Sequence, residues 1–258
     1  MMRIGIAGIH GRVGRLLVEE VRREGADLVG GTSRRGADSA GDAADITRFD
    51  SLDALVAQSQ VIIDFTHPEA TAAHAAIIAQ SAAAWVLGTT GLTPEAQQAV
   101  ERAAKRVPVV QAANFSPGVC LMLSLATRMA AALPADIYDA EILEMHHRQK
   151  IDAPSGTALA IGAAVTRGRD DGREAVHESG RHGQTGPRKP GAIGFASLRG
   201  GQIVGEHMLS FTAGSEQITL THRAFDRRVF AAGAVRAALW TRDRPAGLYG
   251  MEDVLGLR

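Results

Sequence analysis

Length, composition and charge set the first limits on what this chain can be. At 258 residues it can bury a hydrophobic core in one large or two modest domains, so its stability does not require disulfides or a structural metal. Its 28 basic residues balance 28 acidic ones. The overall charge therefore gives no reason to expect nucleic acid or an anionic membrane as a partner.

The single cysteine, Cys120, cannot form an internal disulfide and suits a reducing compartment. We expect it to be a small core residue rather than a catalytic thiol. No apolar run approaches the roughly 20 residues of a membrane span. The chain also starts directly with a strand and a glycine turn rather than a signal peptide, so we expect a cytoplasmic protein.

The first 116 residues alternate short β-rich runs with alanine-rich helical patterns. The expected strands cover residues 3–7, 28–31, 61–65, 85–87 and 107–111. Residues 13–23 have the apolar spacing of an amphipathic helix, and a helix over 94–105 opens with Thr93 as N-cap and Pro94 in its first turn. This alternation predicts an α/β fold whose parallel sheet is covered on both faces.

The pattern changes after Asn114, and a second domain is expected over residues 117–227. Its helices are expected at 117–132 and 155–167, an extended run at 137–145, and a loop rich in Gly, Arg and His at 168–191. Three alternating strand candidates follow at 193–198, 203–212 and 217–221, which predicts a mostly antiparallel sheet. A last helix at 229–240 is apolar enough to return to the first domain, so residues 228–258 are expected to complete 1–116.

A glycine-rich turn joins the first strand to the first helix. Gly8, Gly11 and Gly14 are spaced as G-x-x-G-x-x-G, where a pyrophosphate can lie on the backbone N–H groups of the turn and the helix N-terminus. An ordinary glycine-rich turn is the alternative, because the commoner spacing is G-x-G-x-x-G. The residues between these glycines belong to the same candidate cofactor site: Ile9, His10, Arg12 and Val13.

The end of the second strand normally selects between the two nicotinamide dinucleotides. An acidic residue there accepts hydrogen bonds from a free ribose hydroxyl, but this chain carries Ser33, Arg34 and Arg35 instead. These side chains can hold a 2′-phosphate, so we expect NADPH to be preferred over NADH. A solvated charged loop is the alternative.

Two later turns are expected to line the nicotinamide half of the same cleft. Both follow strands of the parallel sheet, and ligands of such sheets lie beyond the carboxyl ends of the strands. The candidate residues are Gly88, Thr89 and Thr90 in one turn, and Ala112, Ala113, Asn114 and Phe115 in the other.

The densest group of chemically active residues lies between Glu141 and Ala158. His146 and His147 are adjacent at a strand end and point to opposite faces, so they are not expected to chelate one metal, and no metal site is predicted. One histidine can transfer a proton while the other, with Lys150, holds an anion.

The segment after Lys150 opens a helix whose first N–H groups can hold a carboxylate. Ser155, Gly156 and Thr157 stand at its start and form the candidate cradle. The alternative is that Ser155 only caps the helix and that the two histidines are surface residues.

The run E-x-x-E-x-H-H-x-x-K-x-D-A-P-S-G-T-A resembles the signature of the 4-hydroxy-tetrahydrodipicolinate (dihydrodipicolinate) reductase family. The resemblance extends over essentially the whole chain, through residues 8–14, 64–66, 88–91, 112–116, 190–195, 203–207 and 233–236. It implies a Rossmann-like nucleotide domain and an α+β domain that binds substrate and forms a homotetramer through its sheet. It also implies NAD(P)H-dependent reduction of a cyclic dicarboxylate in the diaminopimelate pathway of lysine biosynthesis.

The resemblance assigns a role to each candidate in the second domain. It implies that His146 is the general acid and Lys150 a second proton donor, while His147, Gly156 and Thr157 bind a substrate carboxylate, with Ser155 beside them. Family members that use NADH well carry an acidic residue in place of Ser33, so the resemblance leaves NADH as a second cofactor in question and the reaction untouched.

Other protein classes fit the residues less well. An NADP-dependent oxidoreductase acting on a sugar or aldehyde would share the glycine turn but has no need of the two histidines and Lys150. A non-catalytic NADPH sensor would not need them either, and a serine hydrolase would lack the G-x-S-x-G elbow around Ser155. His10 has no chemical role of its own in this interpretation, and neither do His177, His182 and His207.

Overall fold

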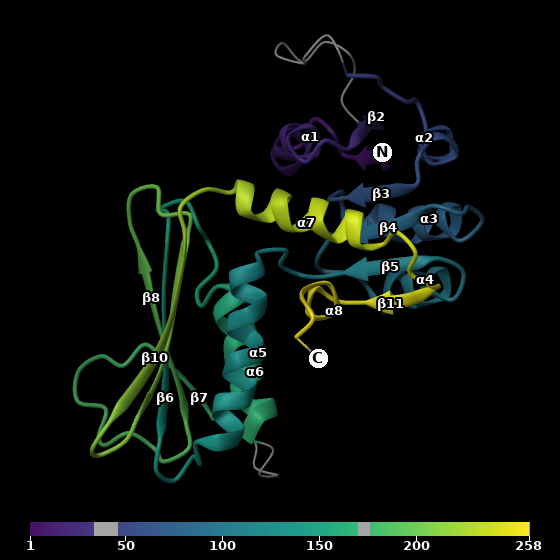
Figure 1. Cartoon of the computed structure of the whole chain (residues 1–258). Helices are drawn as coiled ribbons and strands as arrows, with labels where there is room; N and C mark the ends of the chain where they lie inside the picture. The colour runs from purple at the N-terminus through teal and green to yellow at the C-terminus, as the bar shows by residue number, and fades with distance from the viewer. Residues whose placement is uncertain (34–45, 170–175, 258) are drawn as a thin grey trace. The chain divides into compact units, whose positions relative to one another are not determined.

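The computed structural model describes residues 1–33, 46–169 and 176–257. The chain divides into two compact units, one formed by Met1–Pro117 with Arg227–Arg258 and the other by Gly118–Asp226 (Figure 1). In the part of the chain that is described, no helix is long and apolar enough to cross a membrane.

The first unit is built on a six-stranded parallel sheet in the order β11-β5-β4-β3-β1-β2. Its strands are β1 (Arg3–Ala7), β2 (Asp27–Thr32), β3 (Val61–Asp64), β4 (Ala84–Leu87), β5 (Pro108–Gln111) and β11 (Gly247–Tyr249). β3 and β4 are buried at every residue, as expected for parallel strands with both faces covered. The expected α/β, Rossmann-like fold is therefore confirmed for this unit.

Two groups of helices pack on this sheet. α1 (Arg12–Arg23) packs against α7 (Arg228–Trp240), and α3 (Pro68–Ile78) packs against both α2 (Leu52–Gln58) and α4 (Pro94–Ala104). α4 starts as expected, with Thr93 accepting a hydrogen bond from the Ala96 amide at 3.3 Å. The C-terminal residues return to this unit through α7, β11 and α8 (Met251–Leu255).

The second unit is built on a five-stranded sheet in the order β10-β9-β6-β8-β7. Its strands are β6 (Asp139–His146), β7 (His177–Ser179), β8 (Ile193–Arg199), β9 (Gly205–Thr212) and β10 (Gln217–Ala224). Apolar residues of α5 (Pro117–Ala132) and α6 (Gly156–Arg169) cover one face and form a core with Ile142, Phe195 and Phe211. β6 lies in the middle of this sheet, with alternate residues buried.

This sheet is mixed, whereas the sequence predicted a mostly antiparallel one. β6 pairs antiparallel with β9 and parallel with β8, and β8 pairs parallel with β7. The reason is the connection, because α6 carries the chain across the sheet between β6 and the next strands, and such a crossover returns it in the same direction. β7 itself lies within the segment expected to be a loop.

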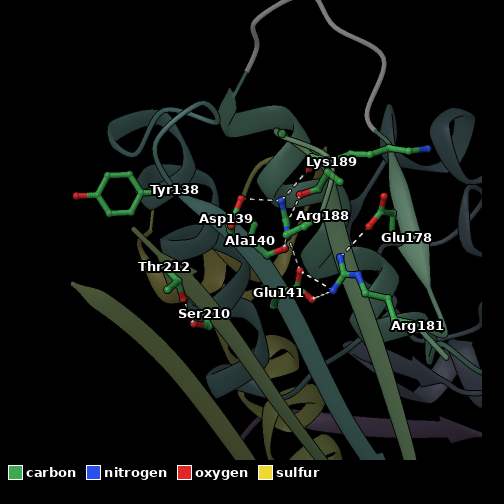
Figure 2. Close-up of polar contacts among 12 residues, drawn as sticks. Tyr138, Asp139, Ala140, Glu141, Glu178, Arg181, Arg188, Lys189, Ser210 and Thr212 are labelled. Atoms are coloured by element: carbon green, nitrogen blue, oxygen red, sulfur yellow. Dashed lines mark hydrogen bonds and ion pairs between the residues drawn. The ribbon is translucent and has the colours of Figure 1, made fainter. Parts of the chain in front are cut away.

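An ion-pair network holds the segment before β8 against the outer face of β6 (Figure 2). The Arg188 guanidinium donates to Asp139 Oδ1 at 2.7 Å and to Glu141 Oε1 at 2.8 Å. Arg181 donates to both Glu141 oxygens at 3.1 Å. Glu141 lies over Gly194 on β8, where an added Cβ would fall 2.0 Å from its Oε2, so a side chain here would require the carboxylate to move.

Candidate active site

The turn between β1 and α1 has the backbone geometry that phosphate binding needs. Gly8 has a φ of +82°, and its amide donates to the carbonyl of Thr32 at 2.9 Å. A Cβ on Gly14 would lie 2.3 Å from the Gly8 carbonyl oxygen, so a side chain there would break the turn. No side chain among the described residues caps α1, which leaves its N-terminus suited to an anion.

The dinucleotide-selecting position is only partly visible. Ser33 follows β2 directly and is half-buried. Arg34 and Arg35 lie outside the described residues, so the phosphate-binding role expected for them stays a prediction.

The loops that follow β3, β4 and β5 meet at the carboxyl edge of the sheet. Asp64 is fully buried, and its carboxylate accepts hydrogen bonds from the Thr66 amide at 3.0 Å and from the Thr66 hydroxyl at 2.6 Å, while His74 Nδ1 lies 2.7 Å from its other oxygen. The Thr89 hydroxyl in turn donates to the Thr66 carbonyl at 3.3 Å. This clamp fixes the turn after β3 beside Thr89, one of the predicted cofactor residues.

Close packing brings the remaining candidates of this unit to the same edge. A Cβ on Gly88 would lie 2.3 Å from the Phe65 ring, and that ring packs at a tilt against Phe115 with 5.4 Å between ring centroids. A Cβ on Gly8 would lie 3.2 Å from Thr66, so the glycine turn adjoins the β3 loop. The structure thus gathers the predicted segments after β1, β4 and β5 around the loop after β3.

In the second unit, His146 ends β6 with its ring largely buried. Its Nδ1 lies 2.5 Å from Glu144 Oε2, and Glu144 is itself only 1% exposed. Arg199 donates from Nη1 to Oε2 at 2.9 Å and from Nη2 to Oε1 at 2.8 Å, and the Ser155 amide donates to Oε1 at 3.2 Å. Burial alone would raise the pKa of Glu144, but the hydrogen bonds from Arg199, Ser197 and His146 outweigh it and bring the pKa to about 2.

A second histidine packs against His146. The ring of His207 on β9 lies edge-on to His146 with 5.2 Å between ring centroids, and its Nε2 is 3.3 Å from the Ser155 hydroxyl. Burial lowers the pKa of His207 to about 4, with the charges of His146 and His222 adding to the effect. Burial also lowers the pKa of His146, and the hydrogen bond to Glu144 offsets this only in part.

The other predicted residues of this unit lie in the segment that joins β6 to α6 and in the first turn of α6. The Lys150 ammonium donates to both Asp152 oxygens at 2.9 Å, and the Lys150 amide donates to the His147 carbonyl at 3.1 Å. Gly156 is exposed and opens α6, with Thr157 half-buried beside it.

Ser155 takes the capping role that the sequence left open. Its hydroxyl accepts from the Ala158 amide at 3.2 Å, and the residue is 1% exposed. We therefore leave Ser155 out of the residues proposed to contact substrate.

Three residues of this site had no assigned role in the sequence interpretation: Glu144, Arg199 and His207. Strand register explains their position, because His146 pairs with Arg199 on β8 and Glu144 pairs with His207 on β9. The sequence offered two signals: Glu144 lies two residues before His146 and so shares its face of the strand, and Glu144 and His207 both fall in segments that carry the family resemblance.

Two family models together match nearly the whole chain. "Dihydrodipicolinate reductase, N-terminus" matches residues 2–115 and "Dihydrodipicolinate reductase, C-terminus" matches residues 118–255. The chain belongs to the dihydrodipicolinate reductase family. This confirms the family resemblance seen in the sequence.

Curated relatives and solved structures agree with this family. The 4-hydroxy-tetrahydrodipicolinate reductase of Gluconacetobacter diazotrophicus is 62% identical over 256 residues, covering 99% of this chain and 98% of the relative. The same enzyme of Acidiphilium cryptum is 58% identical over 256 residues, covering 99% and 98%. Dipicolinate-bound dihydrodipicolinate reductase from Paenisporosarcina sp. TG-14 is 27% identical with a TM-score of 0.82, covering 99% of this chain and all of that one.

A more distant likeness bears on the alternative oxidoreductase. A probable dehydrogenase from Thermotoga maritima has a TM-score of 0.63 at 10% identity, covering 99% of this chain and 93% of that chain. At that identity the two chains share a fold and nothing more can be inferred. The match to the reductase family models and to the curated reductases, and not this likeness, disfavours the sugar or aldehyde oxidoreductase considered from the sequence.

The lowered pKa of His207 predicts a specific pH dependence of stability. Because His207 has a pKa of about 4 when folded and its ordinary value of 6.5 when unfolded, the unfolded chain binds the proton first as pH falls. Its contribution is complete above pH 6.5 and is lost as pH falls toward 4, a loss on the order of 3 kcal/mol. His207→Gln should therefore flatten the decline in the free energy of unfolding over this window, measured by urea denaturation.

The control for this experiment is the exposed histidine His182. His182→Gln should leave the decline as in the unmodified chain. An equally steep decline in His207→Gln would contradict the view that His207 is held neutral by burial.

Proposed function

We propose that this chain reduces dihydrodipicolinate, formed from 4-hydroxy-tetrahydrodipicolinate, to tetrahydrodipicolinate with NAD(P)H in lysine biosynthesis. The observation that carries the proposal is the buried His146, bonded to Glu144 beside the first turn of α6, in a chain 62% identical to a reductase of this name. The dipicolinate named in the Paenisporosarcina structure is a planar cyclic dicarboxylate, which supports a substrate of this class.

The first unit, proposed as residues 1–116 with 228–258, fits a dinucleotide. In the turn at Gly8 and Gly14 the backbone packs so closely that a Cβ on Gly14 would meet it. The start of α1 suits a pyrophosphate. The dinucleotide, when bound, supplies hydride. We assign Gly88, Thr89 and Thr90 to its nicotinamide half, together with Ala112, Ala113, Asn114 and Phe115.

The second unit, proposed as residues 117–227, fits the dicarboxylate. The first turn of α6, which begins at Gly156, contains no acidic residue, so its N–H groups suit a carboxylate. We assign Gly156, Thr157 and His147 to that carboxylate. Lys150 is held by Asp152, so a substrate carboxylate would compete with Asp152 for its ammonium. His146 gives a proton to the enamine that forms when hydride adds to the conjugated imine.

We also propose a homotetramer formed through the outer face of the second sheet. This face carries Leu143, Met145 and Met208 side by side in register, with Leu198 51% exposed next to Met145. An apolar strip of this kind on the sheet face opposite α5 and α6 suits contact with another copy of the chain. Cys120 is buried and forms no disulfide, which suits the cytoplasm as the proposed compartment.

His146→Ala tests the proposed proton transfer. Loss of a positioned general acid typically costs about 10²- to 10⁴-fold in rate, so kcat should fall by at least that lower bound while the Kd for NADPH changes little. The assay follows NADPH oxidation with substrate generated in place by the preceding synthase. His182→Ala is the matched exposed control, and near-normal turnover in His146→Ala would show that the proton comes from another donor.

The proposed preference for NADPH is tested on the segment after β2. Replacing Arg34 and Arg35 together by alanine removes two cations that can pair with a 2′-phosphate, and each such charge-assisted contact contributes about 1.5–3 kcal/mol. We expect kcat/KM for NADPH to fall at least about 10-fold and kcat/KM for NADH to stay within about 2-fold. A clear preference of the unmodified chain for NADH would refute the assignment.

A further inference from the structure

Glu144 is a buried carboxylate whose hydrogen-bond partners come from several elements. Arg199 on β8 binds both of its oxygens with a pair of charge-assisted hydrogen bonds. The carboxylate also binds Nδ1 of His146 and the Ser155 amide. It therefore joins the end of β6, the start of α6 and β8 at one point.

The two nitrogens of the His146 ring have different surroundings. Nδ1 is committed to Glu144 at 2.5 Å. Nε2 lies against Gly205 of β9, where an added Cβ would stand 3.0 Å from it, and the φ of Gly205 is one that other residues can adopt. A carboxylate at one imidazole nitrogen fixes the hydrogen there and leaves the other nitrogen to exchange protons.

We propose that Glu144 is the positioning residue for His146: it holds Nδ1–H so that Nε2 is the nitrogen that delivers the proton, while Gly205 leaves that nitrogen room. The inference rests on the proposed function, in which His146 is the general acid. In the step, the Nε2–H bond breaks as the proton forms a C–H bond with the substrate enamine. The imidazolium becomes a neutral ring that keeps its Nδ1 hydrogen on Glu144.

The charges around His146 come from several elements. Glu144 is on the same strand, Arg199 on β8, and Lys150 with Asp152 on the segment after β6. His207 on β9 packs against the His146 ring. His222 on β10 packs against His207 in turn, with 6.3 Å between the His207 and His222 ring centroids. Glu144 is the nearest group that favours the charged ring against burial, Lys150 and Arg199, so its neutralisation should make His146 harder to protonate.

Glu144→Gln is the first test. With the negative charge gone, the pKa of His146 should fall, so the alkaline decline of kcat should move to lower pH. At neutral pH we expect kcat to drop about 10- to 100-fold, less than in His146→Ala, with the KM for the dicarboxylate within about 3-fold. An unchanged pH profile in a folded Glu144→Gln protein would overturn the proposal.

Glu141→Gln is the matched control. Glu141 lies on the opposite face of the same strand and is also paired with arginine, in its case Arg181 and Arg188 (Figure 2). Its replacement removes a similarly paired carboxylate, so a general loss of stability would appear in both variants. Only Glu144→Gln should shift the pH profile.

Two further measurements decide the question if Glu144→Gln does not fold. Gly205→Ala places a methyl group in close contact with Nε2 of His146 and leaves Glu144 unchanged. It should lower kcat at least about 10-fold while leaving NADPH binding unchanged. The imidazole ¹⁵N shifts of His146 in the unmodified protein should show hydrogen on Nδ1 in the neutral ring. Hydrogen on Nε2 instead would contradict the inference.

The nitrogen shifts do not depend on turnover, so they test the role of Glu144 separately from the role of His146 as proton donor. If His146→Ala stays active, the proposed proton donor is wrong, and the shifts still report whether Glu144 fixes the ring.

Discussion

A buried carboxylate has to be paired, and Glu144 is the one around which the second unit places its chemistry. With a side chain 1% exposed, it would be strongly destabilising without the Arg199 guanidinium. The same pairing holds its pKa at about 2, so it stays charged at any pH at which the protein is expected to work. From this fixed negative point, hydrogen bonds define where His146 and the start of α6 lie.

The mixed sheet is what makes this arrangement available. β6 runs through the middle of the sheet, so the end of the strand has a partner on each side, Arg199 on β8 and His207 near it on β9. Residues 147–155 join the end of β6 to the start of α6, so the helix N-terminus lies at the same end, where the Ser155 amide binds Glu144. In the first unit the candidate site is positioned by close backbone packing rather than by charge pairing, as in the turn at Gly8 and Gly14.

The sequence predicted the first unit well because buried parallel strands read as continuous apolar runs. It expected helices between the strands but gave no bounds for α2 and α3, whose short alanine-containing segments carry little periodic contrast, and it did not predict β11, a three-residue edge strand. In the second unit the sequence predicted every strand except β7. It did not predict the strand directions, because a crossover and a hairpin leave similar apolar patterns on the strands that they join. β7 was missed because its three residues, His177, Glu178 and Ser179, are polar.

The candidate site shows the same division. His146, Lys150 and the start of α6 were identified because they lie close together in the sequence. Arg199 and His207 are 53 and 61 residues from His146 in the chain, and only strand register brings them to it. Glu144 lies in the same segment of sequence, but a carboxylate two residues before a histidine can be assigned a role only when the structure shows both buried on one face of the strand.

The most direct measurement of the central claim is a crystal structure of the chain with NADPH and pyridine-2,6-dicarboxylate. The account predicts one carboxylate of the ligand on the backbone N–H groups of Gly156 and Thr157. It also predicts the ligand ring within reach of His146 Nε2, with Nδ1 still on Glu144. A ligand bound away from α6, or a His146 ring turned so that Nδ1 faces the ligand, would contradict it.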